Sequence, residues 1–347
     1  MKKTDIFPLV LFVSIGLVLC VSAQAKTIKL RVGHDLPPFT APGIAYQAFA
    51  DEVNKKAAGR VEVEVFPAGS LGEQASALEM VNSGVADAYH ISLSTHRSHF
   101  PITNVEALPG HSFPATPEGY LAHAKAVFSL IEKYPVVANE FKDYQFLSDL
   151  INPTNLIMSA NKQIRVPEDL KGLKVGGTGI KLELFKACGG AGVFNILPEA
   201  YQALQTGVID AAALHWTGLG EFKFYEVVKY VLEMPLDQTS LAFLMSKRSW
   251  NKLSGEDQKI VMAAAEKAAM IEYKVISERA ADGIQKFKAY GKGRVITVPT
   301  ASEEKLWEEK FQPLHDKWAA ERESQGVKNA REILDYYKSL VDKAWGK

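Results

Sequence analysis

The stretch IKLRVGHDLPPFTAPGIAYQAFADEVNKKAAGRVEVEVF, residues 28–66, decides the fold class. Apolar and charged residues alternate over 28–32 and again over 61–65, and this period of two predicts strands. Between them, residues 45–53 carry apolar side chains at helical spacing. Because a strand, a helix and a second strand follow one another closely, we expect a βαβ unit and a layered α/β domain.

The alternation of strand and helix patterns continues and then restarts near residue 150. We expect further extended segments at 86–91, 146–151, 156–159, 174–175 and 208–214, and helical segments at 78–81, 167–170, 182–187 and 199–206. Two α/β lobes in series fit this order better than one large sheet. The last third is predicted to be helical, with a long helix that the sequence Ser254-Gly255-Glu256-Asp257 begins and one or two more over 303–345.

The first 25 residues have the features of a secretory signal peptide. They comprise a basic start, an apolar run over 7–21 and the small-x-small site Ala23-Gln24-Ala25. A retained membrane anchor is disfavoured because the run is shorter than the ~20 residues of a spanning helix. A lipoprotein signal is disfavoured because Leu19, before Cys20, is not small. We therefore expect a periplasmic protein whose remaining cysteine, Cys188, has no intramolecular partner.

Composition narrows the function classes without naming one. The 347 residues are 47% hydrophobic and 23% charged, and 40 Lys and Arg balance 40 Asp and Glu. This composition is globular, and the length suggests about two domains. The balanced charge gives no indication of a nucleic-acid or anionic-membrane partner. Two cysteines exclude a disulfide scaffold and a CxxC zinc module.

Catalytic and nucleotide-binding motifs are not found in the sequence. It contains no GxSxG, HExxH or GxxxxGK[ST] pattern. Gly176-Gly177-Thr178-Gly179 follows a predicted strand, but Leu182 occupies the last glycine position of a dinucleotide-binding GxGxxG motif. A tight turn that presents backbone N–H groups is the simpler interpretation of this segment.

The histidines allow two interpretations. His90, His96 and His99 lie within ten residues, but no nearby carboxylate or cysteine completes a tetrahedral metal site, so we predict no metal. His215 and Trp216 follow a predicted strand, where ligands of open α/β sheets gather. They can contact a small molecule there, or they can be a buried core tryptophan beside a hydrogen-bonded histidine.

Several sequence blocks occur in the order and spacing of one family. They are residues 30–34 (LRVGH), 49–53 (FADEV), 59–61 (GRV), 65–72 (VFPAGSLG), 167–175 (PEDLKGLKV), 199–210 (EAYQALQTGVID), 224–230 (FYEVVKY) and 250–253 (WNKL). The chain resembles the solute-binding proteins of TRAP transporters, the DctP-type family of tripartite ATP-independent periplasmic uptake systems. The resemblance runs from about Ile28 to the long helix near Ala289.

The resemblance implies a two-lobed periplasmic binding protein with hinge strands, a cleft between two α/β lobes and a long C-terminal helical region. We expect residues 1–25 to be the signal peptide, 26–152 with about 238–275 to form lobe 1, 153–237 with about 276–300 to form lobe 2, and 301–347 to form C-terminal helices. Such proteins capture a small solute, mostly an organic acid, by lobe closure and deliver it to two integral-membrane subunits. No cofactor and no enzymatic activity are implied.

Three positions depart from the family pattern. The family arginine that clamps a ligand carboxylate corresponds to Gly176, a second arginine falls near Leu156, and the usual asparagine corresponds to Leu214. A bidentate arginine–carboxylate contact is strong, so its loss changes ligand recognition. The candidate ligand-binding residues are Phe39, Tyr89, His90, Arg97, Gly176, Gly177, Thr178, Leu214, His215 and Trp216.

These residues favour an aromatic or largely apolar acid, or an amino-acid-like compound. A C4-dicarboxylate-type acid bound through other donors is the alternative for the solute. Two alternatives to uptake are a ligand-capture module for a sensor and, least favoured, a periplasmic enzyme, because no nucleophile–base pair stands at a recognisable spacing.

Overall fold

The computed structural model describes residues 26–195 and 197–347, so the predicted signal peptide lies outside the described residues. The strands are β1 (Ile28–Gly33), β2 (Val61–Phe66), β3 (Ala88–Ser92), β4 (Tyr144–Ser159), β5 (Lys174–Gly177), β6 (Ala191–Phe194), β7 (Ala211–Leu214), β8 (Tyr230–Ser246) and β9 (Val295–Thr297). The α-helices are α1 (Ala41–Lys56), α2 (Ala77–Ser83), α3 (Pro117–Lys133), α4 (Pro135–Ala138), α5 (Lys181–Ala187), α6 (Leu197–Thr206), α7 (Trp216–Glu221), α8 (Lys247–Trp250), α9 (Gly255–Ala289), α10 (Ala301–Ser324) and α11 (Ala330–Ala344). Short 3-10 helices include η2 (Thr103–Ala107) and η4 (Pro167–Leu170).

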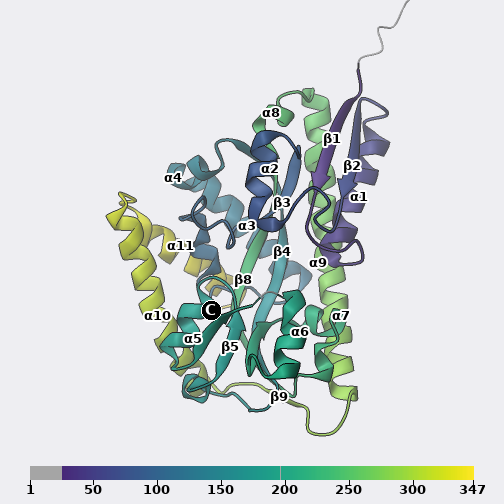
Figure 1. The fold of residues 1–347 in the computed structure, drawn as a ribbon. Helices are drawn as coiled ribbons and strands as arrows, with labels where there is room; N and C mark the ends of the chain where they lie inside the picture. Colours follow the sequence, from purple (N-terminus) through teal and green to yellow (C-terminus); the bar gives the residue numbers. More distant parts are fainter. Residues whose placement is uncertain (1–25, 196) are drawn as a thin grey trace, which may run out of the picture.

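Two long antiparallel strands, β4 and β8, connect the two halves of the molecule (Figure 1). The strand order is β2-β1-β3-β8-β4-β7-β5-β6, with β9 paired to β8. Lobe 1 contains β1–β3 with α1–α4, and lobe 2 contains β5–β7 and β9 with α5–α7. The structure confirms the prediction of two α/β lobes. The expectation that two lobes would replace a single large sheet is wrong. Since β4 and β8 belong to both lobes, one hydrogen-bonded sheet runs through the molecule.

The structure corrects the sequence pattern at these connecting strands. Residues 146–151 and 156–159 belong to one strand, β4, whose pairing with β8 shifts register between Asn152 and Asn155. The polar sequence Asn152-Pro153-Thr154-Asn155 interrupts the apolar run at this point. No strand is predicted over 230–246, because β8 is buried on both faces for most of its length and therefore lacks a period of two.

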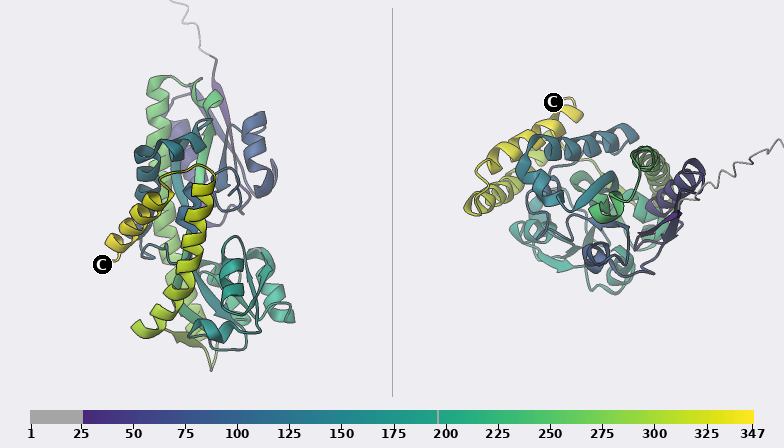
Figure 2. Two further views of the ribbon diagram at one scale, coloured as in Figure 1. Left: turned by 90° about the vertical axis from the view of Figure 1, so that its left-hand side faces the viewer. Right: turned by 90° about the horizontal axis from the view of Figure 1, so that it is seen from above.

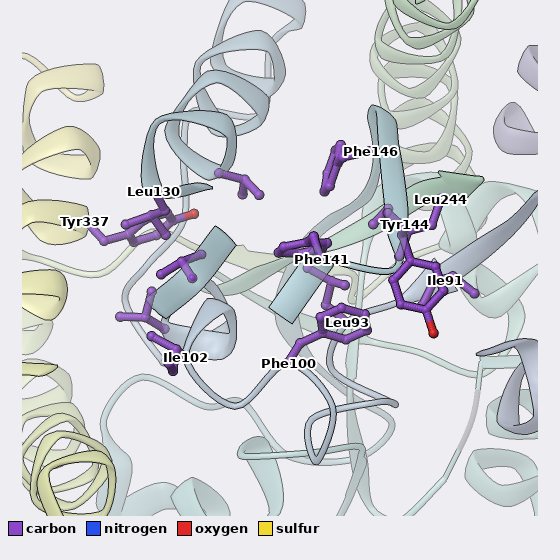
Figure 3. Packing of buried hydrophobic residues seen from close by; sticks show 14 of the residues in the cluster. Ile91, Leu93, Phe100, Ile102, Leu130, Phe141, Tyr144, Phe146, Leu244 and Tyr337 are labelled. Carbon is purple, nitrogen blue, oxygen red and sulfur yellow. The ribbon is translucent and has the colours of Figure 1, made fainter. Parts of the chain in front are cut away.

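Each lobe has its own hydrophobic core. In lobe 1, one cluster packs between the sheet and α3 and includes Ile91, Phe100, Leu130, Phe141, Phe146 and Leu244 (Figure 3). A second lobe 1 cluster joins β1 and β2 to α1 and α9. Lobe 2 has one cluster around Leu204, Trp216 and Phe287 and another around Val175, Phe185 and Trp307. Separate cores allow the lobes to move as two units.

Two helices, α9 and α10, each extend along both lobes and lie on opposite sides of the view in Figure 1. α9 packs on α1 in lobe 1 and on α7 in lobe 2. At the start of α10, Glu303 pairs with Arg165 near η4 in lobe 2 at 2.7 Å. Further along α10, His315 Nε2 donates to the Pro109 carbonyl of lobe 1 at 2.7 Å. Figure 2 shows α10 running lengthwise beside both halves of the molecule.

A buried cluster of ionisable side chains lies in lobe 1. His123 Nδ1 lies 3.1 Å from Asp149 Oδ2, and His123 Nε2 lies 3.3 Å from Glu106 Oε2, with all three side chains buried. Burial opposes the imidazolium, but the hydrogen bond to Asp149 and the nearby carboxylate of Glu106 outweigh it and raise the pKa of His123 to about 9. Burial raises the pKa of Glu106 to about 7. The cluster ties α3 and η2 to β4.

We predict that Gly283→Ala destabilises the packing of α7 on α9. A Cβ at Gly283 would lie 2.1 Å from the Trp216 carbonyl oxygen, which belongs to backbone and cannot rotate away. The free energy of unfolding should fall by about 1–3 kcal/mol in urea denaturation. Gly255→Ala in the same helix is the control, since no atom lies within 4 Å of its Cβ position. Equal stability of the two variants contradicts this packing.

We predict that the stability of the protein decreases as the pH rises from 6.5 to 9. The folded protein keeps the His123 proton up to a pKa of about 9, whereas the unfolded chain loses it near 6.5. The stabilisation that His123 provides is fully present below pH 6.5 and is lost as the pH rises through 9. Over this range the free energy of unfolding should fall by up to about 1.4 kcal/mol per pH unit. Urea denaturation at several pH values should show a shallower slope for His123→Gln and an unchanged slope for His99→Gln, an exposed histidine.

Candidate functional site

The carboxyl ends of the parallel strands in both lobes converge on the middle of β4 and β8. At the end of β3, Ser92 pairs with Leu241 of β8, and at the end of β7, Leu214 pairs with Leu156 of β4. Both pairs lie next to the irregular segment of β4, residues 152–155. In open α/β sheets, ligands bind just beyond the carboxyl ends of strands. The candidate site is therefore the junction between the lobes.

Lobe 1 contributes buried imidazoles to this junction. His34 follows β1 and His90 lies in β3, and each is 1% exposed. His34 stacks on Tyr46 with ring centroids 5.1 Å apart, and His90 Nε2 lies 3.9 Å from Asp35 Oδ1. Burial lowers the pKa of His34 to about 4 and also lowers the pKa of His90, so both rings are neutral at pH 7.

Several polar atoms of this group have no hydrogen-bond partner among the described residues. They are both ring nitrogens of His34, Nδ1 of His90 and the hydroxyl of Tyr46. Buried polar atoms in folded proteins normally find partners, from protein or from water. The lobe 1 side of the junction therefore offers hydrogen-bonding groups that the protein does not use internally. Sequence analysis predicts His90 but not His34 or Tyr46.

Lobe 2 contributes Leu214, His215 and Trp216 at the end of β7. His215 Nδ1 accepts a hydrogen bond from the Gly218 N–H at 2.9 Å, which places the ring proton on Nε2. Burial lowers the pKa of His215 to about 4. Trp216 is 8% exposed and packs edge-on against Phe287 at 5.8 Å. The interpretation of Trp216 as a core residue thus fits the structure better than that of an open stacking surface.

The remaining predicted residues are dispersed. Phe39 is 59% exposed in the loop before α1. Tyr89 is fully buried in the lobe 1 core, and its hydroxyl donates to the Gly72 carbonyl at 2.7 Å. Arg97 is exposed and lines a cavity of about 530 Å³ between the lobes, opposite Gly179 and Ile180 and beside α10. Of these three residues, Arg97 faces the other lobe across a cavity.

The glycines at the end of β5 are closely packed. A Cβ at Gly176 would lie 2.7 Å from Ile209 Cδ1, and one at Gly177 would lie 3.1 Å from Phe185 Cε2. Thr178, the next residue, is half-buried. Position 176, where the resemblance places an arginine, therefore holds no cation, and any side chain there must displace Ile209.

A buried ion pair that sequence analysis does not predict lies beside these glycines. Lys181 Nζ lies 2.5 Å from Asp237 Oδ2, and Asn155 Nδ2 donates to Asp237 Oδ1 at 2.9 Å. Asp237 and Asn155 belong to β8 and β4 at the junction. One signal was present in the sequence, because Lys181, Leu184 and Phe185 share one helical face and a lysine on an apolar face is unusual.

Two lobes, shared long strands and a polar junction at the strand ends define a two-lobed binding protein. The family model for bacterial extracellular solute-binding protein, family 7, matches residues 32–322, and the chain belongs to this family, that of the TRAP solute-binding proteins. No helix in the described part of the chain has the length and apolar character needed to cross a bilayer.

Individual relatives agree with this assignment. The C4-dicarboxylate-binding periplasmic protein DctP of Rhodobacter capsulatus is 27% identical over 308 residues, covering 88% of this chain and 91% of the relative. A TRAP periplasmic solute-binding protein from Desulfovibrio salexigens, solved as an open complex, superposes with a TM-score of 0.80 at 25% identity, covering 92% and 97%. One from Rhodoferax ferrireducens, in complex with copurified benzoate, has a TM-score of 0.80 at 23% identity, covering 92% and 99%.

We predict that the packing at Gly176 can be relieved by a second substitution. Gly176→Ala should lower the free energy of unfolding by about 1–2 kcal/mol, because the new methyl group meets Ile209 Cδ1. Ile209→Val removes that atom and costs about 0.5–1.5 kcal/mol alone. In a double-mutant cycle measured in urea, Gly176→Ala should cost less when Ile209→Val is already present. Equal costs with and without Ile209→Val contradict the proposed contact.

Proposed function

We propose that this protein captures one small organic solute at the junction of its lobes and delivers it to two integral-membrane TRAP subunits. Family membership supports a solute-binding role in an uptake system. Export through cleavage of residues 1–25 is part of the proposal and is supported by the sequence features of a signal peptide. Binding without chemical conversion is also part of it, so the solute should be recovered unchanged after incubation with the protein.

We propose that the lobes rotate about the middle of β4 and β8. The boundaries are those expected from the sequence, with lobe 1 at 26–152 and about 238–275 and lobe 2 at 153–237 and about 276–300. The register shift between Asn152 and Asn155 supports a hinge there, because an irregular ladder bends more readily than a regular one. Closure is favourable when the solute contacts both lobes, since only the closed state gains both sets of contacts.

The proposed solute is an aromatic or otherwise largely apolar acid, or an amino-acid-like compound. The observation that carries this proposal is the replacement of the guanidinium clamp by the tightly packed Gly176. Leu214, 2% exposed, adds an apolar group in place of the usual asparagine. The benzoate complex of the Rhodoferax protein indicates that this fold can enclose an aromatic acid, and it supports the proposed solute class to that extent.

The proposed contacts come from residues at the edges of the junction. Arg97 and His90 of lobe 1 and His215 and Thr178 of lobe 2 are the polar candidates. The buried positions of Tyr89 and Trp216 favour a role in shaping the site from behind. A C4-dicarboxylate remains the alternative solute, favoured by the similarity to the Rhodobacter protein. In uptake the partner is the pair of TRAP membrane subunits, whereas in sensing it is a sensor domain. A pull-down that identifies the partner therefore distinguishes the two roles.

We predict that aromatic monocarboxylates or aromatic amino acids raise the melting temperature of the purified protein. The panel contains benzoate, phenylacetate, phenylalanine, succinate and malate, each well above a micromolar Kd. A solute at a hundredfold excess over its Kd adds about 2.7 kcal/mol to the free energy of unfolding, which a thermal-shift assay detects. Stabilisation by succinate or malate, with none by the aromatic compounds, rejects the proposed solute class in favour of the alternative.

A further inference from the structure

Lys181 is an unusual residue for its position. It begins α5 and shares a buried helical face with Leu184 and Phe185, and only 7% of its side chain is exposed. Its partner, Asp237, has a side chain that is 1% exposed. Lysine is almost never buried to this degree unless its charge is paired. The structure therefore holds one ammonium and one carboxylate together inside the protein.

The ion pair leaves the ammonium only partly satisfied. An ammonium group has three N–H donors. Asp237 Oδ2 accepts one of them, and Asp237 Oδ1 is occupied by the Asn155 amide. No other described residue accepts a hydrogen bond from Lys181 Nζ, and the nearby Glu183 pairs instead with Lys317 of α10 at 2.6 Å. Since a buried donor without an acceptor is costly, the two remaining N–H groups call for an acceptor from outside the protein.

The position of the pair coincides with the candidate site. A Cβ at Gly177 would lie 3.6 Å from Lys181 Cβ and 3.8 Å from Ala213 Cβ, so the lysine stem lies over the carboxyl ends of β5 and β7. Asp237 pairs with Asn155 at the irregular middle of β4 and β8. The ammonium is therefore held where the two lobes meet, beside Gly177 and on the opposite face of β5 from Gly176.

We propose that Lys181 is the residue that binds the carboxylate of the solute, through the two N–H groups that Asp237 leaves free. Asp237 and Asn155 act as positioning residues that orient the ammonium. This inference rests on the proposed function and narrows it from apolar acids and amino-acid-like compounds to one class of acid.

The charge balance of the pair defines that class. Asp237 already neutralises the single ammonium, so one incoming carboxylate leaves the group of three with a net charge of −1. A second carboxylate on the same solute would find no further cation in the ion pair. Arg97, the other cationic candidate, is exposed, so water weakens its compensation for the lost hydration. The site therefore selects monocarboxylates with an apolar remainder and disfavours dicarboxylates.

The test compares the charged and neutral forms of one solute on variants of the full-length mature protein. Isothermal titration calorimetry measures binding of benzoate, its neutral analogue benzamide, and succinate to the wild type and to K181M/D237N. The double substitution removes both charges, so no lone charge is left buried. K186M, which removes an exposed lysine from the same helix, is the matched control. Circular dichroism and melting temperature establish that each variant is folded.

We expect benzoate to bind the wild type and K186M equally and K181M/D237N about ten- to a hundredfold more weakly, the value of a hydrogen bond to a charged group. Benzamide should bind K181M/D237N as well as or better than the wild type. K181R keeps the cation and should retain part of the benzoate affinity. If the double variant does not fold, K181R still tests whether a cation at this position binds benzoate.

Two results overturn the inference and separate it from the proposed function. If K181M/D237N, or K181M where the double variant is unfolded, binds benzoate as tightly as the wild type, Lys181 does not bind the carboxylate, although solute capture stands. If the wild type binds phenylalanine, whose own ammonium balances its carboxylate, but not benzoate, the inferred class is wrong and the amino-acid-like solute of the proposed function stands. If none of the aromatic compounds binds, both are wrong.

Discussion

The pairing of β4 with β8 is the constraint on which the rest of the structure depends. These strands carry the hydrogen-bonded ladder from one lobe to the other, and every parallel strand of the sheet is attached to one of them directly or through one or two intervening strands. The polarity of the sheet then follows, because β3 and β7 run antiparallel to their long neighbours and end near the middle of the pair. Strand direction alone therefore determines where the candidate site lies, and the side chains determine only its chemistry.

The junction carries polar side chains where the β4–β8 ladder is irregular. At the register shift in the middle of β4, residues 152–155 are Asn-Pro-Thr-Asn in place of the aliphatic residues on either side. Lys181 of α5 pairs with Asp237 of β8, and the neutral imidazoles of His34 and His90 lie in lobe 1. Lobe 2 thus carries a cation paired to an acid, whereas lobe 1 carries uncharged hydrogen-bonding rings and, at the cavity between the lobes, the exposed Arg97.

Elements with one exposed face are the easiest to predict, although the buried strands β3 and β7 are also predicted from their short apolar runs. β1 and β2 alternate apolar and charged residues, so their period is visible, whereas β8 is buried on both sides and has no period to detect. For the candidate site, the strand-end rule directs attention to residues 176–178 and 214–216 but cannot tell which of these side chains face the junction. Trp216 packs on Phe287, a contact that no local pattern encodes. Lys181 was detectable as a lysine on an apolar helical face, but its partner lies 56 residues away and only the tertiary fold brings them together.

The placement of α10 has a mechanical consequence for the whole molecule. This helix is fastened to lobe 2 by Glu303 and Lys317 and to lobe 1 by His315, so it spans the gap opposite α9. Because α10 contacts both lobes, any change in the angle between them has to stretch or break the Glu303–Arg165, Lys317–Glu183 or His315–Pro109 contact.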